Sequence, residues 1–74
     1  MNVNKLVRMA NQIAENFDYG PDKHKAAEGT ADHLRRFWTP EMKQLIIPYS
    51  RQDRHELSKV AALAVAKLGQ GQSG

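Results

Sequence analysis

The chain has 74 residues and no cysteine, and its eleven lysine and arginine residues against eight acidic ones give a formal net charge of +3. A chain this short forms a single domain, and the lack of cysteine excludes disulfides, thiolate metal sites, iron–sulfur ligation and cysteine nucleophiles. The longest apolar run, residues 60–66, is far below the roughly 20 residues that span a bilayer, and no signal-peptide pattern opens the chain, so we expect a soluble, cytoplasmic protein.

The first predicted helix covers residues 4–17. Apolar residues recur there at spacings of three and four, which places them on one helical stripe. The stripe consists of Val3, Leu6, Met9, Ala10, Ile13 and Phe17. Arg8, Asn11 and Gln12 fall outside it, so packing of the stripe does not account for them. Residues 18–21, which end in Gly-Pro, terminate the helix.

The second predicted helix opens at Pro21, because proline is favoured at the first helical position, and Asp22 suits its first turn. Its apolar face carries Ala27, Ala31, Leu34 and Trp38. Gly29 lies in the middle of this helix and costs about 1 kcal/mol relative to alanine. The glycine is therefore either tolerated or marks the close approach of another group.

A third, short helix is predicted from residues 39–41, Thr-Pro-Glu, to Tyr49. This tripeptide supplies an N-cap hydroxyl, a proline at the first helical position and an acid beside the positive end of the helix dipole. Residues 50–52 are a polar connection. The fourth helix is predicted over residues 53–68, with Gly69 as its stop.

The fourth predicted helix is apolar around its whole circumference between residues 60 and 66. Such a helix is buried on more than one side. It is either a central core helix with alanines on its exposed side, or a helix whose Leu63, with Ala62 and Ala66, meets a partner chain. Residues 70–74 contain no apolar side chain and are expected to be a disordered tail.

Four helices joined by short turns predict an all-α fold, a small bundle of about four helices that forms a single domain over residues 1–69. We expect Trp38 at the centre of its core. The predicted core residues are Leu6, Ile13, Phe17, Leu34, Trp38, Leu45, Ile46, Leu57, Ala61 and Ala64.

Residues 33–42 concentrate unusual chemistry, because they hold the only tryptophan, Phe37, an arginine pair and a corner between two helices. Tryptophan and arginine are frequent at interface hot spots, and an arginine fork binds carboxylates or phosphates well. Motifs for catalysis are missing: the histidines lack metal-site spacing, and there is no phosphate-binding loop or nucleophile elbow. We therefore assign no catalytic, cofactor-binding or metal-binding residue.

Two segments resemble the delta subunit of the soluble NAD-dependent formate dehydrogenases. They are residues 6–14, LVRMANQIA, and residues 33–38, HLRRFW, with residues 21–22, Gly29, Pro40 and Met42 in matching places. The resemblance extends to about residue 68. It implies a non-catalytic accessory subunit without a redox centre, which stabilises the complex or assists cofactor loading. Partner subunits of this family hold a molybdenum or tungsten bis-pterin, iron–sulfur clusters, FMN and NAD.

We therefore expect the chain to dock onto the large catalytic subunit. The predicted partner-binding residues are Arg8, Asn11, Gln12, Gly29, His33, Arg35, Arg36, Phe37 and Leu63. An alternative is a free-standing basic module that binds nucleic acid, against which acidic residues are interspersed among the bases. A third possibility is a helical oligomer that assembles from copies of this chain alone.

Overall fold

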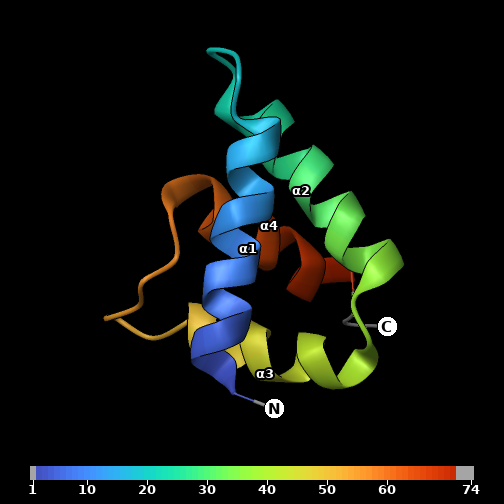
Figure 1. Cartoon of the computed structure of the whole chain (residues 1–74), viewed down its shortest axis with the longest axis vertical. Coiled ribbons are helices and arrows are strands. Elements are labelled where there is room, and N and C mark those ends of the chain that lie inside the picture. The colour runs from blue at the N-terminus through green and yellow to red at the C-terminus, as the bar shows by residue number, and fades with distance from the viewer. Residues whose placement is uncertain (1, 72–74) are drawn as a thin grey trace.

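The computed structural model describes residues 2–71, and four α-helices account for most of them (Figure 1). They are α1 (Val3–Phe17), α2 (Lys23–Phe37), α3 (Pro40–Ser50) and α4 (Lys59–Gly71). Helices α1 and α2 run in opposite directions beside each other, α3 crosses the base, and α4 lies behind α1 and α2. The predicted all-α, single-domain bundle of four helices is confirmed. None of the described helices is long and apolar enough to cross a membrane.

Short polar side chains begin the first three helices, as the sequence rules anticipate. The Asn4 N–H donates to Asn2 Oδ1 at 2.9 Å, and the Met42 N–H donates to Thr39 Oγ1 at 3.3 Å. Asp22 caps α2 by accepting from the Lys25 N–H at 3.1 Å. Helix α2 therefore begins two residues after its predicted start at Pro21, because Asp22 is the cap and not a first-turn residue.

The start of the fourth helix was predicted wrongly. Helix α4 begins at Lys59, six residues after the expected start, and residues 51–58 form the connection from α3. Ser58 caps the helix by accepting from the Ala61 N–H at 3.2 Å. At its other end α4 passes the expected stop at Gly69 and continues to Gly71. Residues 72–74 of the predicted tail lie outside the described residues.

The core agrees with most of the predicted residues. Leu6, Leu34, Trp38, Ile46, Leu57, Ala61 and Ala64 are buried, and Trp38 retains 5% of its exposure. Leu45 was predicted wrongly, because it is 40% exposed on α3. Ile13 and Phe17 are only partly buried, since α1 turns Val7 and Ala14 into the core instead.

Small side chains line the contact between α2 and α4, which is the most extensive helix pairing in the molecule. Ala27 and Ala31 of α2, and Ala61 and Ala64 of α4, retain at most 2% of their exposure. Alanines let two helix backbones approach closely, and they carry the small volume that such a close contact requires. Helix α4 accordingly packs against all three other helices, as the first interpretation of its apolar circumference predicts, and the partner contact of Leu63 stays a prediction.

A buried lysine closes the corner between α2 and α3. Lys43 retains 8% of its exposure, and its Nζ donates a hydrogen bond of 2.9 Å to the backbone carbonyl of Arg35. That carbonyl belongs to the last turn of α2, where carbonyl groups lack helical partners and the helix dipole favours a cation. The contact fixes the end of α2, which carries Arg35, Arg36 and Phe37.

Candidate partner-binding surface

Two rows of residues, each spaced four apart, meet between α1 and α2. Met9, Ile13 and Phe17 form one edge of α1, and Gly29, His33 and Phe37 form one edge of α2, because residues four apart lie on the same side of a helix. We call these six residues the α1–α2 face. The rings of Phe17 and His33 lie 6.3 Å apart in an edge-to-face arrangement, and those of His33 and Phe37 lie 4.8 Å apart.

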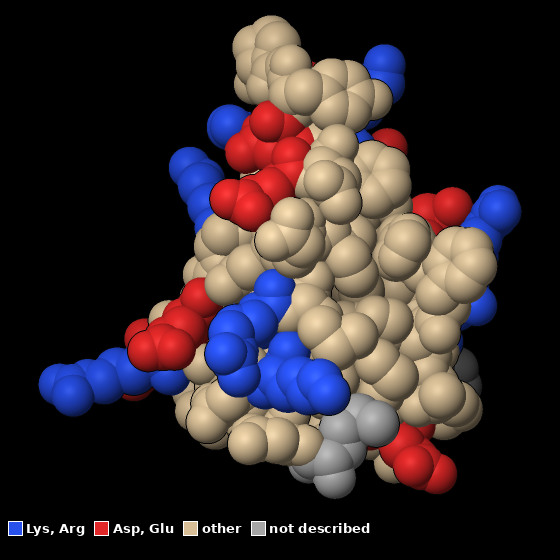
Figure 2. All heavy atoms as spheres, in the orientation of Figure 1, with Lys and Arg blue, Asp and Glu red and all other residues tan. Residues whose placement is uncertain are grey.

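The α1–α2 face is apolar and open to solvent. Phe37 is 70% exposed and Met9 is 37% exposed, whereas Ile13, Phe17 and His33 are partly buried. Figure 2 shows a continuous band without charged side chains over α1 and α2, with charged groups along its sides. A contiguous exposed apolar surface on a small protein is a feature of interaction sites.

Gly29 belongs to this face because of a close internal contact. A β-carbon at Gly29 would come within 2.6 Å of the Phe17 ring. The close approach that the mid-helix glycine suggested is therefore made by a side chain of the same molecule. The absent side chain lets the Phe17 ring approach α2 beside His33.

We predict that Gly29→Ala destabilises the protein, although alanine is the better helix former. The helix propensity gain is about 1 kcal/mol, whereas forcing a methyl group into a filled space costs about 1–3 kcal/mol, so the net loss is about 0–2 kcal/mol. In a Phe17→Ala background the clash is gone, and the same substitution should stabilise by about 1 kcal/mol. Urea unfolding of the parent, both single variants and the double variant measures this reversal. An equal effect of Gly29→Ala in both backgrounds would contradict it.

The arginine pair lies at the exposed C-terminal end of α2. Both side chains approach the same carboxylate: Arg36 Nε lies 3.1 Å from Asp32 Oδ2, and Arg35 Nη1 lies 3.7 Å from Asp32 Oδ1. All three side chains are at least half exposed, so these ion pairs contribute little stability. A partner carboxylate that binds either arginine has to compete with Asp32.

A second group of basic residues borders the α1–α2 face on its other side. Lys5, Arg8 and Gln12 surround Met9 and Ile13 at a shallow depression of about 340 Å³. Among the described residues neither Lys5 nor Arg8 has a salt-bridge partner. Figure 2 shows lysine and arginine side chains over the N-terminal half of α1, the segment that carries both. These cations are available to an external anion.

Asn11, another predicted partner-binding residue, is engaged within the molecule. Its side-chain Nδ2 donates to the Glu56 carbonyl at 2.9 Å, and its Oδ1 accepts from the Ser58 N–H at 2.8 Å. These two bonds attach the connection before α4 to the side of α1. Asn11, which lies outside the apolar stripe of α1, thus stabilises the fold through these two hydrogen bonds.

The structure brings together some of the predicted partner-binding residues and separates others. Gly29, His33 and Phe37 share one face, and Arg8 and Gln12 border it. Leu63 lies apart on α4, where it is partly buried against the core. The sequence pattern placed Met9, Ile13 and Phe17 on the apolar stripe of the first helix, with Ile13 and Phe17 in the core, and it did not select Lys5. The four-residue spacing of both rows was the signal that could have revealed the face.

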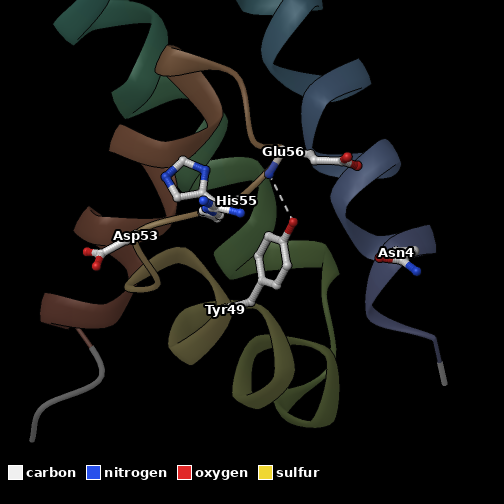
Figure 3. A pocket seen from close by; sticks show the side chains of 6 residues that line it. Asn4, Tyr49, Asp53, His55 and Glu56 are labelled. Atoms are coloured by element: carbon white, nitrogen blue, oxygen red, sulfur yellow. Dashed lines mark hydrogen bonds between the residues drawn. The ribbon is translucent and has the colours of Figure 1, made fainter.

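Another depression on the described surface, of about 590 Å³, has a different character. It is lined by polar and charged residues of α1, α3 and the connection before α4: Asn4, Tyr49, Asp53, Arg54, His55 and Glu56. The Tyr49 hydroxyl accepts a hydrogen bond of 2.9 Å from the Glu56 N–H, which holds this connection to α3 (Figure 3). In Figure 3 the carboxylates of Asp53 and Glu56 point to opposite sides. The two acids therefore do not converge on a common point, as paired catalytic carboxylates would.

Within residues 2–71, no group of three or more histidine, aspartate or glutamate side chains is placed to hold a metal ion. The chemically distinctive surface of the described chain is thus the α1–α2 face with its basic border. No curated protein and no solved structure matches the chain. A family model described as the NADH-dependent formate dehydrogenase delta subunit, FdsD, matches residues 5–65.

Proposed function

Because the chain belongs to the delta-subunit family of NADH-dependent formate dehydrogenases, we propose that it is a non-catalytic accessory subunit that binds the large catalytic subunit. In this role it supports assembly, stability or cofactor loading of the enzyme, and the redox cofactors are held by the partner subunits. The family match over residues 5–65 is the observation that carries the proposal.

The exposed surface supports a binding role. Phe37 is a large aromatic residue, yet it is 70% exposed at the end of α2. Exposed aromatic surface costs free energy in the isolated chain, and a partner that covers it recovers that free energy. The proposed contacts also include the partly buried His33 and the exposed Arg35 and Arg36. The guanidinium groups of the two arginines can pair with carboxylates of the partner.

The proposal is tested by co-expressing an affinity-tagged form of the full chain with the catalytic subunit. We expect the catalytic subunit to co-purify, and we expect the isolated chain to show no formate-dependent reduction of NAD. A chain with Arg35→Ala and Arg36→Ala should remain folded, because removal of exposed arginines rarely costs more than about 0.5 kcal/mol. It should capture less catalytic subunit. Failure of the unsubstituted chain to capture it, or formate oxidation by the isolated chain, would overturn the proposed function.

A further inference from the structure

We propose that the α1–α2 face binds an amphipathic helix of the catalytic subunit, and that acidic residues on one flank of this helix pair with Lys5 and Arg8. This inference rests on the proposed function, because it names the chemistry of the surface that the partner presents. The main contact is made by the α1–α2 face together with Lys5 and Arg8, and Arg35 and Arg36 of α2 contribute less to binding.

The shape of the face favours a helix as the occupant. Each row extends over eight residue steps, or about 12 Å at the rise of an α-helix, which matches roughly two turns of a partner helix. Helices α1 and α2 lie antiparallel beside each other (Figure 1). The backbone groups inside a helix are paired with one another, so neither helix offers an edge to which a strand could add. Binding must therefore come from side chains, as it does when an amphipathic helix docks against an apolar surface.

The aromatic part of the face supplies the expected anchor. Phe37 is the more exposed of the two phenylalanines, and the His33 ring lies 4.8 Å from Phe37 and 6.3 Å from Phe17, so it connects the two rows. Because the Phe17 ring lies against Gly29, this ring is held by packing before any partner binds. Preformed aromatic side chains with few free torsions lose little conformational entropy on binding, which makes them effective hot spots.

The basic residues on the two sides of the α1–α2 face differ in whether they already have an acidic partner, and this difference predicts which flank of the partner helix is acidic. On the α2 side Arg36 already contacts Asp32 at 3.1 Å, so the cation there has an acid within the molecule. On the α1 side Lys5 and Arg8 border Met9 and Ile13 and have no salt-bridge partner among the described residues. An acid placed opposite them gains an ion pair without displacing another.

The same charges argue against a second copy of this chain as the occupant. A symmetric dimer through the α1–α2 face would bring two identical cationic borders to one interface. Like charges across an interface suppress association, whereas a partner with acidic residues is attracted to this border. A helix of different sequence, apolar on one side and acidic on the flank, fits both observations.

The test measures binding of the purified full chain to the catalytic subunit prepared without it, by titration calorimetry at low and moderate salt. Two variants probe the two parts of the face: Phe37→Ser removes the exposed ring, and Lys5→Glu with Arg8→Glu reverses the border. Each has a matched control. Tyr19→Ser removes a ring that is 86% exposed in the α1–α2 connection, and Arg51→Glu with Arg54→Glu makes the same charge change in the connection before α4.

We expect each face variant to bind roughly tenfold more weakly or worse, while both controls bind within about threefold of the parent. Added salt should weaken binding of the parent, because it screens an attraction, and should strengthen binding of the Lys5→Glu, Arg8→Glu chain, because it screens a repulsion. Circular dichroism verifies that all four variants are folded. If the parent binds and folded face variants bind equally well, the inference fails while the proposed function stands. If the parent itself does not bind, the proposed function fails. A dimer of the isolated chain that Phe37→Ser dissociates would identify a second copy as the occupant and overturn the inference.

Discussion

Trp38→Ala should destabilise the protein by about 3–5 kcal/mol, the usual range for truncating a large buried aromatic side chain. Trp38 retains only 5% of its exposure and follows the last residue of α2, where its N–H donates to the Leu34 carbonyl at 2.9 Å. Truncation would leave a cavity at the corner between α2 and α3. Since a domain of this size has about 5 kcal/mol of stability or little more, a large fraction of the variant should be unfolded at room temperature.

Thermal and urea unfolding, followed by circular dichroism, measure the effect. A loss of 1 kcal/mol shifts the melting temperature of so small a domain by about 4–8 °C, so a decrease above about 12 °C is expected. The neighbouring substitution Phe37→Ala is the matched control, because it truncates an aromatic side chain that is 70% exposed. It should change the melting temperature by only a few degrees. Equal effects of the two substitutions would show that Trp38 is not the core residue described here.

Ala64→Leu should destabilise the protein by about 1–3 kcal/mol, because it forces a larger side chain into the closely packed contact between α4 and its neighbours. Ala64 has no exposed surface, and it lies in a helix that α1, α2 and α3 all contact. The added methyl groups cannot be accommodated unless α4 moves away from α2, which would disturb the alanines on both helices.

Ala66→Leu is the control for this prediction, since Ala66 lies two residues further along the same helix and is exposed. Both substitutions change helix propensity equally, so the difference between their urea midpoints isolates the packing effect. We expect Ala66→Leu to change stability by no more than about 0.5 kcal/mol. A chain that tolerates leucine equally well at both positions would show that the α2–α4 contact is loose.

Three of the six residues of the α1–α2 face could be identified from the sequence as candidate partner-binding residues, but the other three could not. Gly29, His33 and Phe37 were identified because a mid-helix glycine and an aromatic residue beside an arginine pair are unusual locally. Met9, Ile13 and Phe17 were assigned to the apolar stripe of α1, which is correct for a helix considered alone. Only the position of α1 against α2 and α4 shows that one edge of this stripe stays open to solvent.

Local patterns by themselves determined the number of helices and their approximate extents. Helix periodicity, the cap at Thr39 and the break at residues 18–21 depend on residues within a few positions of one another. The short segments that resemble the delta-subunit family are likewise contiguous, and the match over residues 5–65 agrees with them. Information of this kind is present in the chain before it folds.

The tertiary structure decided what depends on residues far apart in the sequence. Helix α4 begins at Lys59 where Asn11, 47 residues before Ser58, binds the Ser58 N–H and the Glu56 carbonyl, and where Tyr49 binds the Glu56 N–H. Residues 53–57 are compatible with a helix by composition, but these bonds hold their backbone in another conformation. Phe17 acquires its place against Gly29 in the same way. Hydrogen bonds and ring contacts between residues far apart in the sequence form only when the helices pack. Local periodicity therefore does not predict them.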